Sequence, residues 1–235
     1  MRRARVKGIL KGTNMKAFLL AAGMGKRLHP FTENKPKPLV KLGGVSLIER
    51  NILKLQKCGI EELIINLHHH GEKIVDQLGD GSKFNIKISY SVEQELLGTG
   101  GGVHNAIDHF DGPFILLSSD TFTDFNFKTL ALREDLMAHM VFVPNPETKS
   151  EGDASIIKGK VDPDASEKKY TFSGLSVLSP ELFDDPDIKK RDLWKDFLKP
   201  ASMSGLVSGE IFEGTFENLN TLEDVERLDA LLSEE

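Results

Sequence analysis

Residues 17–40, AFLLAAGMGKRLHPFTENKPKPLV, decide the fold of this 235-residue chain and indicate its chemistry. The apolar opening, residues 17–22, has the length and composition of a strand buried in a parallel sheet. Gly23 and Gly25 end that strand, and because glycine has no Cβ, their backbone N–H groups can approach phosphate oxygens closely. Basic side chains follow at Lys26, Arg27, Lys35 and Lys37. The stretch therefore predicts a strand that leads into a binding site for a polyphosphate.

The glycine spacing differs from the two commonest phosphate-binding motifs. A dinucleotide fingerprint, G-x-G-x-x-G, needs a third glycine where this chain has Leu28. A P-loop, G-x-x-x-x-G-K-[ST], is not supplied by residues 23–27 either. A Rossmann dehydrogenase is therefore kept only as an alternative whose fingerprint fails.

The same stretch matches L-A-A-G-x-G-x-R-[LM]-x-P-x-T, followed by P-K-P-[LV]. This pattern resembles the signature of the sugar nucleotidyltransferases, enzymes that join a nucleoside triphosphate to a sugar 1-phosphate. The resemblance extends over residues 15–232. It implies an α/β fold of the Rossmann-like, three-layer α/β/α type, with a mostly parallel mixed sheet. A small β excursion is expected in the polar region 147–169, within a single domain that spans residues 15–235.

Composition restricts the class of protein and of partner. Hydrophobic residues make up 39% and charged residues 28% of the chain, as in ordinary globular proteins. The net charge of −6 argues against nucleic-acid binding, no apolar run is long enough to cross a membrane, and the single cysteine, Cys58, suits a reducing compartment. We expect a cytoplasmic protein, monomeric or weakly dimeric. Residues 1–14 contain five basic residues and no acid, and they are expected to form a disordered extension.

A second glycine cluster, EQELLGTGGG, occupies residues 93–102. It resembles the family segment L-G-T-A-G, which lies over the base and ribose, and a helix is expected from Val103 onward. The resemblance implies a nucleotide site formed by Leu20, Ala21, Ala22, Gly23, Gly25, Lys26, Glu93, Thr99 and Gly100. The Glu93 carboxylate can accept the N3–H of uracil or the donors of guanine, so the side chain leaves the base open.

Asp120 follows the apolar run 114–117, at the carboxyl end of an expected parallel strand, where open α/β sheets bind ligands. The resemblance implies that this carboxylate holds Mg²⁺ beside the α-phosphate, with Arg27 and Lys37 as the other catalytic residues. Asn218 stands where the family has a second metal-binding aspartate and is expected to be a weak second ligand. Gly152 and Gly174 correspond to positions that border the sugar.

Within the family, the stretch TFSGLSVLSPELF (171–183) and the second glycine cluster look most like N-acetylmuramate 1-phosphate uridylyltransferases. The implied reaction joins UTP to N-acetylmuramate 1-phosphate and releases pyrophosphate, with Mg²⁺ as cofactor. Two alternatives stay open. One is a guanylyltransferase that acts on mannose or heptose 1-phosphate. The other is a nucleotide-binding regulatory paralogue, in which Asn218 has weakened catalysis.

Overall fold

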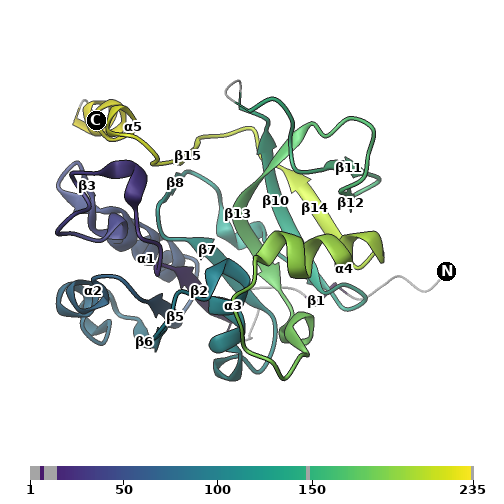
Figure 1. Cartoon of the computed structure of the whole chain (residues 1–235), viewed down its shortest axis with the longest axis horizontal. Helices are drawn as coiled ribbons and strands as arrows, with labels where there is room; N and C mark the ends of the chain where they lie inside the picture. The colour runs from purple at the N-terminus through teal and green to yellow at the C-terminus, as the bar shows by residue number, and fades with distance from the viewer. Residues whose placement is uncertain (1–5, 8–14, 147–148, 234–235) are drawn as a thin grey trace.

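Four neighbouring strands at one end of a nine-stranded sheet run parallel to one another (Figure 1). In spatial order they are β6 (Lys87–Val92), β5 (Glu62–Leu67), β2 (Lys16–Leu20) and β7 (Phe114–Ser118). This computed structural model describes residues 6–7, 15–146 and 149–233. The pairing places Leu20 beside Asn66 of β5 and Ser118 of β7, so the carboxyl ends of three strands meet at one edge.

The other end of the sheet is mixed in direction. Antiparallel to β7 runs β13 (Tyr170–Leu178), which pairs antiparallel with β10 (Ala138–Pro144), and β10 pairs parallel with β14 (Val207–Ile211). The hairpin of β11 (Ser155–Ile157) and β12 (Lys160–Asp162) completes the edge. The predicted α/β fold with a mixed sheet and a β excursion is thus confirmed, and the excursion extends the main sheet.

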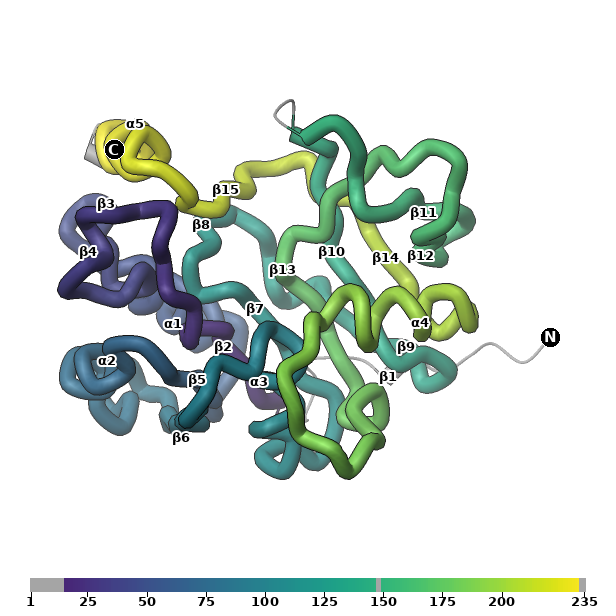
Figure 2. Tube along the Cα trace, in the orientation of Figure 1, coloured from purple at the N-terminus to yellow at the C-terminus, as the bar shows by residue number. Residues whose placement is uncertain are grey.

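Helices cover both faces of the sheet because its central strands are apolar on both sides (Figures 1 and 2). One face packs Leu19 and Ile65 against α1 (Leu47–Lys57) and α2 (Gly71–Leu78). The other packs Phe18 and Ile64 against α3 (Gly98–Asn105) and the joined helices η7 (Trp194–Leu198) and α4 (Lys199–Met203). Strand β2, which leads into the glycine loop, is therefore packed on both of its faces.

A third apolar cluster supports the loop that follows β2. It joins Leu28, Val40 and Leu42 to Val225 and Leu228 of the C-terminal helix α5 (Leu222–Ser233). The C-terminal helix thus packs against the loop. Further along the chain, α1 begins with a capping box in which the Ser46 hydroxyl accepts from the Glu49 N–H and the Glu49 carboxylate accepts from Ser46 N–H.

Short elements complete the described chain. They are β1 (Val6–Lys7), η1 (Lys26–Leu28), η2 (Lys37–Leu39), β3 (Lys41–Leu42), β4 (Val45–Ser46), η3 (Ser82–Phe84), η4 (Ile107–His109), β8 (Thr121–Thr123), η5 (Phe127–Thr129), β9 (Leu132–Arg133), η6 (Pro180–Phe183) and β15 (Phe216–Asn218). β1 pairs with β9, whereas the rest of the expected disordered extension, residues 1–5 and 8–14, lies outside the described residues. The helix expected from Val103 begins five residues earlier, at Gly98.

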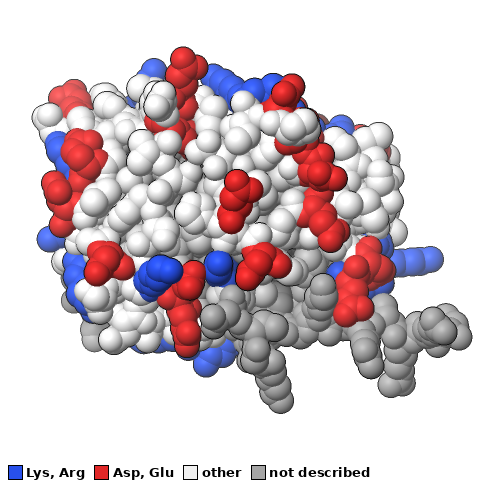
Figure 3. All heavy atoms as spheres, turned by 90° about the horizontal axis from the view of Figure 1, so that it is seen from below, with Lys and Arg blue, Asp and Glu red and all other residues white. Residues whose placement is uncertain are grey.

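Charge distribution on one face and helix hydropathy were the two surface features that the sequence addressed. Figure 3 shows acids and bases interspersed over one face, without a continuous basic area. In residues 6–7, 15–146 and 149–233, no helix is long and apolar enough to cross a membrane.

Candidate active site

A cavity of about 590 Å³ opens where β2 and β7 end. Ten of the residues predicted for the site line it: Leu20, Ala21, Ala22, Gly23, Gly25, Lys26, Arg27, Lys37, Thr99 and Asp120. Eight further residues complete the lining: Met24, Leu28, Pro38, Asn66, Leu96, Gly98, Ser118 and Ser119. The edge that the sequence predicted for ligand binding therefore carries a cavity of the size that small-molecule sites have.

The first glycine loop is built around a left-handed residue. Gly25 has φ +62°, and a Cβ there would lie 3.2 Å from Thr32 Cγ2 and 3.3 Å from Lys37 Cβ. The buried Thr32 hydroxyl donates to the Gly25 carbonyl at 2.8 Å, which closes the loop. Gly23 is different, because an added Cβ would have no atom within 4 Å. The backbone at Gly23 is therefore open to a ligand.

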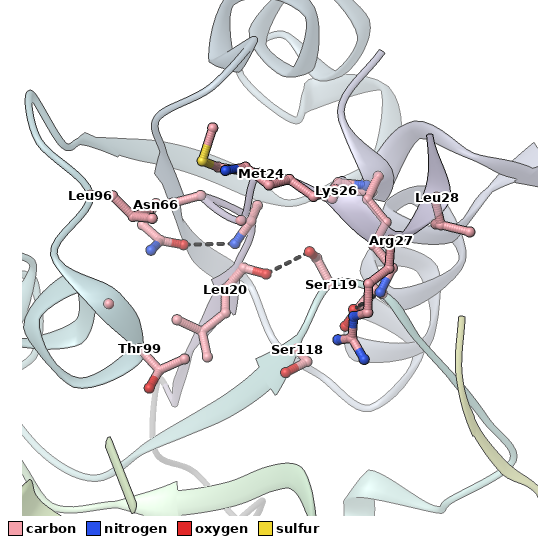
Figure 4. A pocket seen from close by; sticks show the side chains of 18 residues that line it. Leu20, Met24, Lys26, Arg27, Leu28, Asn66, Leu96, Thr99, Ser118 and Ser119 are labelled. Atoms are coloured by element: carbon pink, nitrogen blue, oxygen red, sulfur yellow. Dashed lines mark hydrogen bonds and ion pairs between the residues drawn. The ribbon is translucent and has the colours of Figure 1, made fainter. Parts of the chain in front are cut away.

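Three cationic residues, Lys26, Arg27 and Lys37, and one acid, Asp120, line the cavity. Lys37 forms an ion pair with Asp120, and their side chains are 12% and 28% exposed. Arg27 is exposed, and Figure 4 shows its guanidinium on the side of the cavity opposite Thr99. The short helix η1 brings Arg27 to this position one residue after Lys26. Arg27, Lys37 and Asp120 thus face a common space, as their predicted roles require.

Asp120 is held from both sides by contacts that the sequence analysis did not assign. The buried Asn51 amide of α1 donates to the carbonyls of Ser119 and Thr121 at 3.3 and 3.0 Å. The Ser119 hydroxyl donates to the Leu20 carbonyl at 2.5 Å, one of the contacts drawn in Figure 4. Asn51 could have been found from its place on the otherwise apolar face of α1, between Ile48 and Ile52.

The three consecutive glycines of the second cluster, residues 100–102, pack against protein atoms. A Cβ on Gly100 would lie 2.7 Å from the Phe197 ring, and one on Gly101 would lie 2.4 Å from the Lys189 carbonyl. The Gly100 and Gly101 N–H groups both donate to the Arg191 carbonyl, at 3.0 and 3.2 Å. Gly100, predicted to hold the nucleoside, is absent from the cavity lining, because its amide is engaged by this distant segment. We call residues 185–193, which lie across the start of α3, the strap.

Four other predicted site residues lie outside the cavity lining: Glu93, Gly152, Gly174 and Asn218. Glu93 is 3% exposed, and both carboxylate oxygens accept from protein donors, the Asn66 amide at 2.7 Å and Leu97 N–H at 2.9 Å. A Cβ on Gly152 would lie 2.6 Å from the Tyr170 carbonyl. Gly174, with φ +83°, packs against Ser118, which itself lines the cavity. The structure therefore brings Arg27, Lys37 and Asp120 together with most of the residues predicted for the nucleotide, but leaves Glu93, Gly100, Asn218 and the two glycines predicted for the sugar outside the lining.

Comparisons with known proteins agree with this geometry. Residues 16–152 match the family described as nucleotidyl transferase. The chain is 34% identical over 217 residues to the N-acetylmuramate alpha-1-phosphate uridylyltransferase of Neisseria meningitidis serogroup B, covering 88% of this chain and 94% of that protein. The chain belongs to the nucleotidyl transferase family. The predicted family resemblance is thereby confirmed.

Other relatives of this nucleotidyl transferase differ in the substrates that they are named for. The mannose-1-phosphate guanyltransferase of Kluyveromyces lactis is 29% identical over 210 residues, covering 77% of this chain and 55% of that protein. Among solved structures, HddC from Yersinia pseudotuberculosis with GMP-PN has a TM-score of 0.75 at 23% identity, covering 92% of this chain and 99% of that one. The inositol-1-phosphate CTP transferase from T. maritima has a TM-score of 0.77 at 17% identity, covering 94% and 96%. These two likenesses support the fold.

The donor set of this nucleotidyl transferase suits a hard cation that arrives with phosphates. Asp120 supplies one carboxylate to the cavity, and Asn218 lies on β15, paired with Thr121, where it accepts the Thr121 hydroxyl at 3.0 Å. In the described part of the chain, no three His, Cys, Asp or Glu side chains are grouped to hold a metal. Mg²⁺ commonly binds through one or two carboxylates plus substrate phosphates, so these residues fit it.

Proposed function

We propose that this nucleotidyl transferase transfers the uridylyl group of UTP to N-acetylmuramate 1-phosphate, which yields UDP-N-acetylmuramate and pyrophosphate in the cytoplasm. The observation that carries the proposal is the shared cavity of Arg27, Lys37 and Asp120 at the end of β2 and β7. The choice of substrates rests on the relative from Neisseria meningitidis that matches this chain over 88% of its length.

The reaction needs charge stabilisation more than proton transfer. An oxygen of the sugar phosphate, already ionised at neutral pH, attacks the α-phosphorus of UTP, and the bond from that phosphorus to the oxygen bridging to the β-phosphate breaks. Pyrophosphate leaves with the electron pair of that bond. Because two polyanions must come together in line, the enzyme's main task is to position them and to neutralise their charge.

The residues of the cavity suit that task. Arg27, exposed beside the glycine loop, contacts the triphosphate and the departing pyrophosphate. Lys37, which pairs with Asp120 in the absence of substrate, turns to neutralise the α-phosphate and the incoming sugar phosphate. Asp120, with Asn218 as an uncharged second ligand, would hold Mg²⁺, which when bound screens the α-phosphate charge. The open backbone at Gly23 accepts the phosphates without a steric barrier.

The test is pyrophosphate release from each nucleoside triphosphate with Mg²⁺ and a panel of sugar 1-phosphates. We expect the highest kcat/KM with UTP and N-acetylmuramate 1-phosphate. Higher kcat/KM with GTP and mannose or heptose 1-phosphate would favour a guanylyltransferase, which the relative from Kluyveromyces lactis supports. Nucleotide binding without release of pyrophosphate with any sugar phosphate would identify a regulatory paralogue, for which the uncharged Asn218 is the structural argument.

A further inference from the structure

A buried chain of hydrogen bonds connects the two walls of the nucleotide cavity. Ala21 N–H donates to Asn66 Oδ1 at 2.7 Å, a contact visible in Figure 4. Asn66 Nδ2 then donates to Glu93 Oε1 at 2.7 Å, and Glu93 Oε2 accepts from Leu97 N–H at 2.9 Å. Donation converges on the Glu93 carboxylate from both sides, because the backbone N–H groups at the two ends can only donate and both carboxylate oxygens accept. We call Asn66 and Glu93 the relay.

The relay is a polar link between the two walls, in addition to the apolar packing of α3 against β2. At one end, Ala21 begins the glycine loop on the phosphate side. At the other end, Leu97 is the N-cap of α3 and precedes Gly98 and Thr99, which line the opposite wall. The Leu97 carbonyl also accepts from Arg191 N–H of the strap at 2.9 Å. Two buried side chains thus connect the glycine loop on one wall to the start of α3 on the other.

The surroundings of the relay leave it little freedom. Asn66 and Glu93 are 2% and 3% exposed, so an unmade hydrogen bond at either would be uncompensated by water. The third consecutive glycine, Gly102, lies directly beneath the pair. A Cβ there would lie 2.5 Å from Glu93 Oε1 and 2.7 Å from Asn66 Nδ2. The cluster therefore needs a glycine at 102 to make room for the relay.

We infer that Glu93 is a positioning residue for nucleotide binding, which acts through Asn66 and Leu97 and does not read the base. The inference rests on the proposed function, because it concerns the same cavity. Both Glu93 oxygens are already used by protein donors, and the side chain is absent from the cavity lining. A residue of this kind sets the affinity for every nucleotide that the cavity accepts and leaves the choice between bases to other groups.

The polarity of the relay allows an exchange experiment. In Glu93→Gln, the new amide cannot accept from both Asn66 and Leu97. In Asn66→Asp, a carboxylate faces the Glu93 carboxylate without a proton between them. In the double variant N66D/E93Q, the new carboxylate accepts from Ala21 N–H and from the new amide, and the oxygen of that amide accepts from Leu97 N–H. Each hydrogen bond is thus restored at the same net charge. Glu95→Gln is the matched control, since Glu95 is an exposed residue two positions away.

The readout is the Kd of Mg·UTP, Mg·GTP and Mg·CTP, measured by calorimetry without sugar phosphate. Each single variant should raise the Kd at least tenfold, by the same factor for each nucleotide that the wild type binds. The double variant should return to within threefold of the wild type, and Glu95→Gln should stay within twofold. A tenfold change in the ratio between bases in Glu93→Gln, an unchanged Kd, or a double variant no better than the singles would overturn the inference.

Protein folding and the proposed function can be separated from this result. If a single variant does not fold, a folded double variant with a Kd close to that of the wild type still demonstrates the coupling. A double variant that also fails to fold, although it restores each hydrogen bond, would overturn the inference. Because binding is measured without catalysis, a wild type that binds nucleotide but releases no pyrophosphate would refute the proposed function and leave this test valid.

Discussion

The two glycine-rich segments of this chain look alike in sequence but differ in what fills the space beside them. At Gly23, an added Cβ would have no atom within 4 Å, so the backbone is open to the cavity. At Gly98, Gly100, Gly101 and Gly102, an added Cβ would lie 2.4–2.7 Å from the nearest atom of the strap, of Phe197 or of the relay. The first segment leaves room for a ligand, whereas the second leaves room for the rest of the protein.

The difference shows how a glycine cluster can serve a binding site indirectly. In the second segment, the strap supplies the groups that a ligand could have supplied. The Arg191 carbonyl accepts from two amides at the start of α3, and Leu193 N–H donates to the Thr99 hydroxyl at 2.9 Å. Thr99 lines the cavity, so its wall is held by two sets of contacts. The strap bonds to Thr99 and to the start of α3, and the relay bonds to Leu97. Close packing of the second glycine segment thus helps to shape the cavity to which the first glycine segment is open.

The largest effect on catalysis is expected from a substitution of Lys37, which lies in the open cavity beside the first glycine segment. Lys37→Met keeps the apolar stem but removes the charge that pairs with Asp120 and that we propose to neutralise the α-phosphate. We expect kcat for pyrophosphate release to fall by about 10²–10³-fold, as for the loss of one group that stabilises transition-state charge. Lys41→Met is the control, because Lys41 is exposed and outside the cavity lining. A kcat within tenfold of the wild type would remove Lys37 from the catalytic residues.

Alanine at one glycine of each segment tests the comparison directly. Gly101→Ala forces a methyl group against the Lys189 carbonyl, and overpacking costs about 1–3 kcal/mol. The better helix propensity of alanine offsets about 1 kcal/mol of this. The net loss of stability is therefore up to about 2 kcal/mol. Because a chain of this length loses about 2–4 °C of melting temperature per kcal/mol, the melting temperature of Gly101→Ala should fall by up to about 8 °C, which calorimetry can measure.

Gly23→Ala should show the opposite pattern. Its added methyl meets no protein atom, so the melting temperature should change by less than about 2 °C, since surface substitutions usually cost under 0.5 kcal/mol. The methyl lies on the cavity, and the KM for the nucleotide should rise. Equal losses of stability in the two variants, or an unchanged nucleotide KM in Gly23→Ala, would show that the two segments do not differ as described.

Local chemistry explains what the sequence predicted correctly. Each correctly predicted feature is encoded within a short stretch of sequence. These features are the apolar run before Gly23, the prolines after it and the acid at the end of a second apolar run. The structure brings them to the same edge of the sheet. Ser46 and Glu49 likewise predict the start of α1, because a capping box needs only residues three apart.

What the sequence did not predict depends on contacts between distant segments. Leu193 of the strap is separated from its partner Thr99 by 94 positions in the chain, and no local pattern records that pairing. β14 contains a glycine and a glutamate, so its strand character comes from pairing with β10. Asn66 did leave a signal, a single amide within the apolar residues 63–67 of β5, and such a polar residue needs a buried partner.

The strap can be tested through the ion pair that closes it. Arg191 Nη2 lies 2.5 Å from Asp185 Oδ2, and the guanidinium stacks over the Phe197 ring at 5.4 Å. Arg191→Met keeps the apolar contact and removes the ion pair, which should loosen the wall at Thr99. Because a hydrogen bond to a charged group contributes about 1.5–3 kcal/mol, of which only part reaches the cavity, the nucleotide KM should rise about threefold to tenfold.

The control for the strap is a charge change beside it. Lys190→Met removes one positive charge from an exposed neighbouring residue and should leave the nucleotide KM within twofold. The KM for the sugar phosphate should stay unchanged in both variants, because the strap contacts the cavity wall at Thr99, which we propose to bind the nucleotide. A parallel rise in both KM values in Arg191→Met would indicate a general loosening of the fold, and the two segments would then not act on separate substrates.

The smallest effect is expected at Asn218, on the open side of the comparison. Asn218→Asp replaces an amide that accepts the Thr121 hydroxyl with a carboxylate that can accept the same bond, and it adds one negative charge near Asp120. Because Asn218 is exposed, water screens most of the attraction to a divalent cation, and the remaining gain is about 1 kcal/mol. The Mg²⁺ concentration for half-maximal pyrophosphate release should therefore fall a few-fold. Asn220→Asp adds the same charge two residues later and should leave that concentration unchanged; an equal fall there would mean that general attraction, and not the position of residue 218, determines the affinity for the metal.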